Sequence, residues 1–191
     1  MLHYYGITEL IGEPGSGKTA LAIEESKIYK TLYITSTNFP IKKYDFNKNK
    51  YEEVYIEFVQ STAELLFVLN IKLKQIVVEL IVIDNLYHIV FLDKKSRLEV
   101  TNLIYILKRL IQKYKIRVLV VNTCCFKTID EHKVSFISKL GLNWEYHVNC
   151  KYVCKKMGEG GYTVELVKSP ENNNCKQSYR INKTSIEVDR Q

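Results

Sequence analysis

Residues 6–23 read GITELIGEPGSGKTALAI. The stretch begins with a short apolar run, passes through a glycine-rich segment and continues with apolar residues at helical spacing. Its middle, GEPGSGKT at residues 12–19, fits the pattern G-x-x-x-x-G-K-[ST] without a mismatch. That pattern predicts a strand, a tight loop and a helix, with the backbone of the loop wrapped around phosphate groups. A glycine turn with a chance lysine would give the same letters, but the flanking strand and helix favour the phosphate loop.

Each part of this segment suits the binding of a nucleotide. Glycines let the backbone bend so that several N–H groups point at one anion. The lysine can reach the β- and γ-phosphates, and the threonine hydroxyl can ligate magnesium. The N-terminus of the following helix adds the positive end of its dipole. The expected nucleotide-binding residues are Gly12, Glu13, Pro14, Gly15, Ser16, Gly17, Lys18 and Thr19.

An acidic residue further along the chain completes the expected site. Residues 80–83, LIVI, form a continuous apolar run that is followed by Asp84. A carboxylate at the C-terminal tip of a neighbouring parallel strand can hold magnesium, directly or through water. Asp84 alone could equally be a helix cap or a turn residue. Together with the loop it predicts a metal site formed by Thr19 and Asp84, so we expect ATP, or a close purine nucleotide, and Mg²⁺ as ligands.

The rest of the first two thirds alternates strands with helices. Strands are expected at residues 6–11, 32–36, 54–59, 80–83 and 117–121. Helices are expected at residues 19–29, 61–73 and 96–114. The last two helices begin with Ser and Glu three residues apart, the pattern of a capping box. Residues 37–51 are polar and predict a loop or a short helix. Such alternation implies right-handed crossovers and a parallel sheet covered by helices on both faces.

The last third has a different pattern. Apolar and polar side chains alternate from Trp144 to Lys155, which predicts a strand with one buried face. Glycines near residue 160 predict a turn, and strands are expected at residues 162–167 and about 178–188. These three strands predict an antiparallel meander on one edge of the parallel sheet. We therefore expect a single domain over residues 1–191, with a parallel core at about 1–123 and an antiparallel extension at about 140–191.

Composition narrows the class of protein. A content of 46% hydrophobic and 26% charged residues is typical of a soluble globular protein. The net charge of +7 suits an anionic partner such as nucleic acid, although a general bias towards lysine explains it equally well. Five cysteines, an odd number without a framework spacing, argue against secreted disulfides and predict reduced thiols in or near the core. We find neither a signal peptide nor an apolar run of about 20 residues, so we expect no membrane partner.

Read in order, these segments resemble the RecA/RadA recombinase superfamily, and its eukaryotic branch most closely. The resemblance is carried by ITELIGEPGSGKTALA (7–22), LYITSTNFPIKK (32–43), ELIVIDNL (79–86), VLVVNT (118–123), LGLNWEYHVNCKYV (140–153) and LVKSPENNNCKQSYRINKTSIEV (166–188). It implies a RecA-like P-loop NTPase core. It also implies a recombinase paralogue, a mediator of homologous recombination and DNA double-strand break repair in the nucleus. Single-stranded DNA, and a recombinase or another paralogue, are the partners it implies.

The chain departs from the family at several positions. Active recombinases carry a glutamate just after the second strand, where it polarises the attacking water, and the matching residue is Thr37, which cannot act as a base at neutral pH. The family's Asn-Gln sensor is Asn122-Thr123, so Asn122 is retained as a nucleotide-binding candidate while the longer amide is lost. The phosphate loop begins at residue 12, so we expect the family's N-terminal helical domain and its linker motif to be missing. ATP should bind, and hydrolysis should be slow.

Residues 124–139, CCFKTIDEHKVSFISK, match the loop that contacts single-stranded DNA in the family. Cations interleaved with aromatic rings suit phosphate neutralisation and base stacking. The expected DNA-binding residues are Phe126, Lys127, Lys133, Phe136 and Lys139. Asp130 and Glu131 dilute the charge, so an ordinary solvated loop is the alternative interpretation.

Two other functions fit the phosphate loop. One is a small P-loop nucleoside or nucleotide kinase, which requires arginines in a lid over the phosphates and a site for the acceptor. The late antiparallel meander and the lack of an arginine-rich lid count against it. The other is a non-catalytic partner subunit in which ATP only stabilises an interface.

Overall fold

The computed structural model describes residues 2, 4, 6–40, 54–92, 97–130, 133–171, 175–181 and 186–188. At residues 92, 97–98, 126–130, 133–135, 159 and 188 it describes the backbone alone. The expected capping residue Ser96 and most of the expected loop at 37–51 therefore lie outside the described residues.

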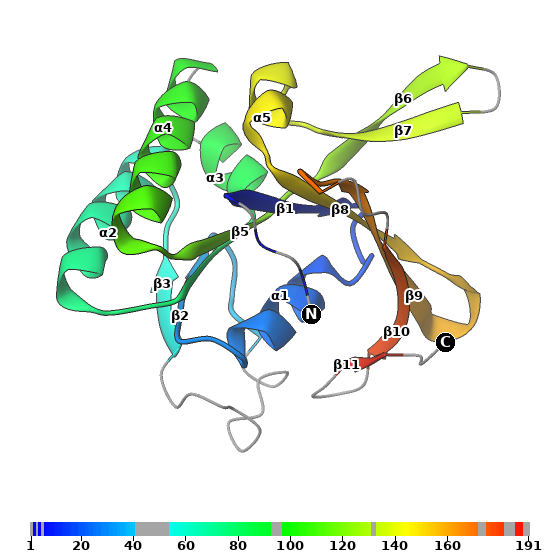
Figure 1. Cartoon of the computed structure of the whole chain (residues 1–191), viewed down its shortest axis with the longest axis horizontal. Coiled ribbons are helices and arrows are strands. Elements are labelled where there is room, and N and C mark those ends of the chain that lie inside the picture. The colour runs from blue at the N-terminus through cyan, green and yellow to red at the C-terminus, as the bar shows by residue number, and fades with distance from the viewer. Residues whose placement is uncertain are drawn as a thin grey trace.

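The elements follow one another in the order that Figure 1 shows. The strands are β1 (Ile7–Gly12), β2 (Thr31–Thr35), β3 (Val54–Phe58), β4 (Leu80–Asp84), β5 (Arg117–Val121), β6 (Cys124–Asp130), β7 (Lys133–Ser138), β8 (Cys150–Lys156), β9 (Gly161–Lys168), β10 (Lys176–Ile181) and β11 (Ile186–Val188). The helices are α1 (Lys18–Ser26), α2 (Thr62–Gln75), α3 (Leu86–Leu92), α4 (Arg97–Tyr114) and α5 (Leu142–His147), with a short 3₁₀ turn at Gly158–Gly160.

Within the described ranges the chain forms a nine-stranded sheet in the order β3, β2, β4, β5, β1, β8, β9, β10, β11. Every neighbouring pair from β3 to β8 is parallel. The pairs from β8 to β11 are antiparallel. The protein is therefore an α/β protein with a mostly parallel sheet flanked by helices and an antiparallel C-terminal meander, as the sequence predicts. Strand β5 lies between β1 and β4, the two strands that lead to the phosphate-loop segment and to Asp84.

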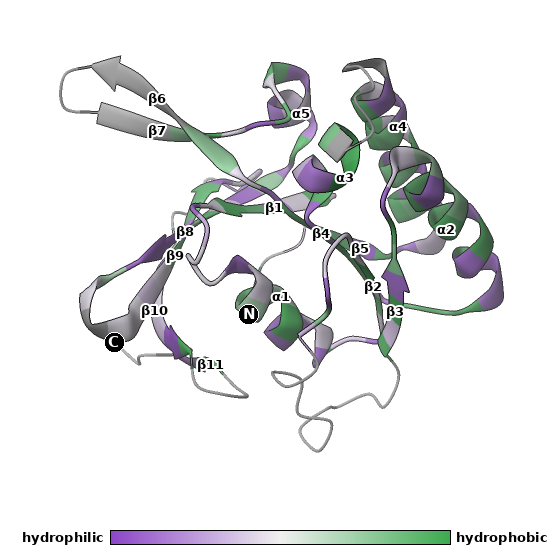
Figure 2. Cartoon of the chain, turned by 180° about the vertical axis from the view of Figure 1, so that it is seen from behind, coloured by the Kyte–Doolittle hydropathy of each residue, from purple (hydrophilic) through white to green (hydrophobic). Residues whose placement is uncertain are grey.

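Two apolar layers cover the two faces of this sheet. Side chains of α2, α3 and α4 pack with Trp144 of α5 on one face. Helix α1 packs on the other face, where the meander strands β9 and β10 curl round beside it (Figure 1). Alternate residues of β4 belong to opposite layers, as Val82 and Ile83 do. Helices α2 and α4 carry hydrophobic and hydrophilic residues side by side (Figure 2), as expected for helices with one buried face. None of the helices in the described ranges combines the length with the apolar composition that a membrane-spanning helix requires.

The cap expected at the start of α2 is confirmed. The Ser61 hydroxyl accepts a hydrogen bond from the Glu64 amide over 3.1 Å. The Glu64 carboxylate in turn accepts from the amide of Gln60 over 2.7 Å. In a standard capping box this carboxylate accepts from the amide of the N-cap residue, which would be Ser61.

The strand expected from Trp144 to Lys155 is wrong in its first half. Residues 142–147 form α5, whose helical hydrogen bonds include the Val148 amide to the Trp144 carbonyl over 3.0 Å. The helix buries the Trp144 ring completely in the apolar layer that α2, α3 and α4 form on one face of the sheet. Burial of this ring outweighs the preference for a strand that the alternation of apolar and polar residues indicates, and the strand begins only at β8. Moreover, β8 pairs in parallel with β1, so the antiparallel part starts with β9.

Three further expectations need correction. Residues 124–139 contain the antiparallel hairpin β6–β7 in place of a loop, which is consistent with the β-branched and aromatic residues in CCFKTID and KVSFIS. The single strand expected at about 178–188 is two strands, β10 and β11. Helix α3 was not predicted, because its seven residues are too few to show a helical period.

Candidate functional site

The expected strand, loop and helix are present around residues 12–19. Strand β1 ends at Gly12 and α1 begins at Lys18. In the connecting loop the Ser16 amide donates to the Glu13 carbonyl over 3.1 Å. Gly17 caps α1 in a left-handed conformation with φ of 86°, and its carbonyl accepts the amide of Leu21. A side chain at Gly17 would be strained by this φ and would begin 2.9 Å from the Tyr179 hydroxyl.

Gly12 is required by close packing against the next strand. A Cβ at this position would lie 2.3 Å from the backbone carbonyl oxygen of Cys154 on β8, well inside van der Waals contact. The loop therefore leaves the sheet through a gap that admits only glycine.

Lys18 is held inside the loop. Its Nζ donates to the carbonyls of Gly12 and Glu13 over 2.8 and 2.7 Å and to Ser16 Oγ over 3.2 Å. Burial lowers the pKa of this ammonium, and the nearby Cys154, Cys124, Asp84 and Glu13 partly oppose the effect. The loop thus concentrates a cation and the N-terminus of a helix at one point, which is the chemistry of a phosphate site.

Asp84 lies beside Thr19. The Thr19 hydroxyl is close enough to the Asp84 carboxylate to lower the pKa of that carboxyl. The Tyr33 hydroxyl donates to Asp84 Oδ2 over 2.9 Å. Burial raises the pKa of Asp84, whereas Thr19, the Tyr33 hydrogen bond and the charge of Lys18 partly oppose the rise. One buried carboxylate next to one hydroxyl is therefore the polar centre of the site.

These two residues fit a magnesium ion that is shared with phosphates. Mg²⁺ is usually bound through one or two carboxylates, several waters and substrate phosphates. Among the described residues there is no group of three or more His, Cys, Asp and Glu side chains that could hold a metal by itself. Thr19 and Asp84 would supply the protein's share of such a shared site.

Sequence reasoning missed two residues at the same edge of the sheet. Ser36 directly follows β2, and its amide donates to the Asp84 carbonyl over 3.1 Å. His88 lies on α3, with Nδ1 2.9 Å from Ser36 Oγ. The sequence alone could not predict that these two residues meet, because they are 52 positions apart. Thr37 is exposed, and its backbone N–H and carbonyl both bond to the Thr35 hydroxyl.

Asn122 is not at the surface of the loop. Its side chain is fully buried, with Oδ1 accepting the Tyr87 amide over 2.9 Å and Nδ2 donating to Glu9 Oε1 over 2.6 Å. Both ends of the amide are therefore engaged inside the protein. Asn122 holds the start of α3 through the Tyr87 amide, and its contact with a nucleotide stays a prediction. Thr123 is half-buried and accepts a hydrogen bond from Asn85.

A sealed polar cluster lies on β1 away from the loop. Its centre is Glu9, which is fully buried and whose Oε1 also accepts from Trp144 Nε1 over 2.6 Å. Glu9 Oε2 has no hydrogen-bond partner among the described residues, and the nearest cation is Lys151 Nζ at 3.9 Å. Lys151 is paired with Glu145 of α5. Burial raises the pKa of Glu9, and Lys151 is the largest influence that opposes the rise.

The five expected DNA-binding residues are only partly described. The side chains of Phe126, Lys127 and Lys133 lie outside the description of the structure. Phe136 is half-buried with Lys155 Nζ 5.0 Å from its ring centroid, and Lys139 is exposed with Nζ 5.4 Å from the Tyr87 ring centroid.

A pocket of about 290 Å³ joins the base of the hairpin to the loop. Its lining residues are Glu13, Pro14, Ser16, Phe136, Cys154, Lys155 and Lys156. The hairpin base and the loop therefore share one cavity.

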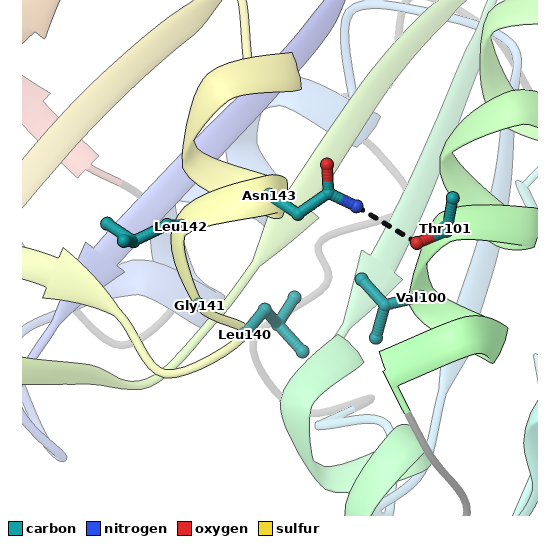
Figure 3. Close-up of a pocket in the computed structure, with 6 residues that line it drawn as sticks. All are labelled: Val100, Thr101, Leu140, Gly141, Leu142 and Asn143. Carbon is teal, nitrogen blue, oxygen red and sulfur yellow. Dashed lines mark hydrogen bonds between the residues drawn. The ribbon is translucent and has the colours of Figure 1, made fainter.

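A second pocket, of about 220 Å³, lies between α4 and the start of α5 (Figure 3). Its lining residues are Val100, Thr101, Leu140, Gly141, Leu142 and Asn143. The Asn143 amide donates to the Thr101 hydroxyl over 2.9 Å. None of these residues belongs to the phosphate-loop segment or to the edge around Asp84, so this pocket is separate from the candidate site.

The cysteines match the expectation of reduced thiols in or near the core. All five are free, and Cys124, Cys150 and Cys154 are buried. Burial raises the pKa of Cys154 to about 12, so this thiol stays protonated at neutral pH.

Comparison of the sequence with protein-family models and with curated proteins returned no match.

Proposed function

We propose that this chain binds ATP with Mg²⁺ through residues 12–19, Thr19 and Asp84. The observation that carries the proposal is the contact between Thr19 and Asp84 at the mouth of the strand, loop and helix. A chance glycine turn would have no reason to meet a buried carboxylate from a strand 65 positions later along the chain. In this proposal the loop amides and Lys18 hold the phosphates.

The magnesium ion would neutralise phosphate charge once it is bound. Thr19 and Asp84 would hold it, and Tyr33 orients Asp84 through its hydroxyl hydrogen bond. Lys18 already lies in the loop, so its ammonium needs only to exchange its acceptors within the loop for phosphate oxygens.

We further propose that the chain has a RecA-like core and acts as a recombinase paralogue in homologous recombination. Support comes from the resemblance of six successive sequence segments to that superfamily and from the net charge of +7. The shared cavity between the loop and the base of the hairpin gives a route by which nucleotide binding can influence the hairpin. Single-stranded DNA, and a recombinase or another paralogue, are the proposed partners, and the nucleus is the proposed location.

Hydrolysis should be slow in this proposal. Thr37 stands where the resemblance calls for a glutamate, and a hydroxyl cannot take a proton from water at neutral pH. Nucleotide would then act chiefly as a ligand that stabilises one state of the protein.

Direct binding of labelled ATP tests the nucleotide proposal. Wild type should bind ATP in the presence of Mg²⁺, and Lys18→Ala should lose most of its affinity. Lys72→Ala is the matched control, because Lys72 is a surface lysine paired with Glu57 on β3. Absence of ATP binding by wild type, or equal affinity in Lys18→Ala, would sink the proposal.

A pull-down tests the recombination proposal separately. With ATP present, the purified chain should retain single-stranded DNA or a recombinase-like protein from an extract of its own cells. Phosphoryl transfer to nucleosides, without either partner, would instead identify a nucleoside kinase.

A further inference from the structure

Hydrolysis of ATP is accelerated by a group that orients the attacking water near the terminal phosphate and accepts its proton. At the edge around Thr19 and Asp84 the described candidates are few. Asp84 is buried, already accepts a hydrogen bond from Tyr33 and lies beside the Thr19 hydroxyl. Burial, reinforced by the charge of Asp84, raises the pKa of Tyr33 well above its ordinary value, so its phenol stays protonated. Serine and threonine hydroxyls do not accept protons at neutral pH, which leaves His88.

The position of His88 is fixed by a chain of hydrogen bonds that starts at the backbone carbonyl of Asp84. The Ser36 amide donates to the Asp84 carbonyl over 3.1 Å, so Ser36 lies next to Asp84 across neighbouring strands. His88 Nδ1 then lies 2.9 Å from Ser36 Oγ. The amide of His88 also donates to Asn85 Oδ1 over 3.3 Å, which fixes the first turn of α3. The imidazole is therefore tied to the carboxyl edge of β2 and β4.

The protonation pattern of this ring suits a base. When Nδ1 carries the hydrogen it donates to Ser36 Oγ, and Nε2 then presents a lone pair. Nε2 has no hydrogen-bond partner among the described residues, and the His88 side chain is exposed. Water can therefore reach Nε2 without displacing a protein group.

Glu13 is the other carboxylate near the loop, and it is exposed. It lines the pocket shared with Phe136 and Lys155, on the β8 side of β1. Asp84 ends β4 and Ser36 follows β2, on the opposite side of β1. The candidate on the same side of β1 as Asp84 is therefore His88.

We propose, on the basis of the proposed ATP site, that His88 is the general base of the slow hydrolysis expected with Thr37 at the glutamate position, and that Ser36 is its positioning residue. The water oxygen forms a bond to the γ-phosphorus, and the bond from this phosphorus to the β–γ bridging oxygen breaks. A proton of the water moves to Nε2 of His88. ADP and phosphate leave, and the imidazolium returns its proton to solvent, so ATP and water give ADP, phosphate and one proton.

The test measures hydrolysis and ATP binding in the same variants, with single-stranded DNA present. His88→Ala should lower kcat by about 10²- to 10⁴-fold, the usual contribution of general acid–base catalysis, with ATP affinity unchanged. Added imidazole should restore turnover to His88→Ala in proportion to its concentration. His147→Ala is the matched control, because His147 is a partly exposed residue of α5 that is bonded to Lys108, and this variant should hydrolyse ATP like wild type.

The outcomes separate this inference from the proposed function. Loss of ATP binding by wild type would remove the ATP site itself. Retained binding with equal turnover in His88→Ala, or with no turnover in wild type, would overturn the role of His88 alone. A loss of turnover that imidazole does not restore would also overturn it, because a structural role predicts no rescue.

Discussion

Two polar regions of the molecule differ in how far they are exposed to solvent. In the sealed cluster, Glu9, Asn122 and Trp144 are fully buried, and Asn122 and Trp144 both donate to Glu9 Oε1. At the open edge around Asp84, the aspartate is buried, but the neighbouring Thr19 is half-buried, and His88, joined to Asp84 through Ser36, is exposed. Buried polar groups that pair inside the protein fix its packing, whereas groups that keep unused bonding capacity at the surface are available to ligands. We therefore expect changes in the sealed cluster to act on stability and changes at the open edge to act on function.

The largest expected effect is on the stability of the protein, and it comes from a change in the sealed cluster. Trp144→Ala removes a fully buried ring and leaves Glu9 without one of its donors. Loss of such a ring costs about 3–5 kcal/mol in the free energy of unfolding. Denaturant unfolding measures it, with Tyr146→Ala as the control, because Tyr146 lies on the same helix and is 81% exposed. Equal stability of both variants would show that the cluster does not anchor α5.

At the open edge, Asp84→Asn should change function with little loss of stability. The asparagine keeps an oxygen that can accept from Tyr33, and it removes a carboxylate whose burial raises its pKa. Mg²⁺ affinity in the ATP complex should fall by at least about 100-fold, the upper end of the loss seen when an outer-shell partner is removed. Titration of ATP binding with Mg²⁺ measures the loss, and binding in EDTA provides the baseline. An unchanged Mg²⁺ dependence would rule out Asp84 as a ligand.

These two regions also differ in how far the sequence could predict them. The strand, loop and helix around residues 12–19 and the position of Asp84 follow from local sequence patterns, because a strand, a turn and a helix N-terminus form from neighbouring residues. The sealed cluster joins Glu9 to Trp144 across 135 positions, and no local pattern encodes that pairing. Trp144 lies in a segment of period two, yet its burial requires a helix there.

Hairpin β6–β7 and His88 illustrate the same limit. The aromatic and basic composition of residues 124–139 indicated a possible contact surface but not its backbone, because a hairpin depends on pairing across its turn. The sequence gives no spacing that links His88 to a partner. Its position four residues after Asp84 does place it about one helical turn beyond the end of the strand. The contact with Ser36, which only the structure shows, is what orients its side chain.

In the sealed cluster, Glu9 should also make the stability of the protein depend on pH. Burial raises the pKa of Glu9 above its unfolded value, so the folded state holds a proton that the unfolded state releases. Stability from this group should therefore fall as pH rises from the ordinary glutamate pKa towards the raised one. Glu9→Gln should remove that slope, while its remaining oxygen still accepts from Asn122 and Trp144. Unfolding measured at several pH values tests the prediction, and a slope identical to wild type would contradict it.

The smallest expected effect sharpens the assignment at the open edge. Ser36→Ala removes the hydroxyl that holds His88 Nδ1 but leaves the amide bond to Asp84 in place. One hydrogen bond contributes about 1 kcal/mol, so turnover should fall about fivefold while ATP affinity stays constant. Ser36→Thr keeps the hydroxyl and should recover most of the activity. Single-turnover hydrolysis is the measurement that isolates the chemical step. Equal loss in both variants would mean that packing at this position, and not the hydroxyl, sets the rate, and His88 would then be held by something other than Ser36.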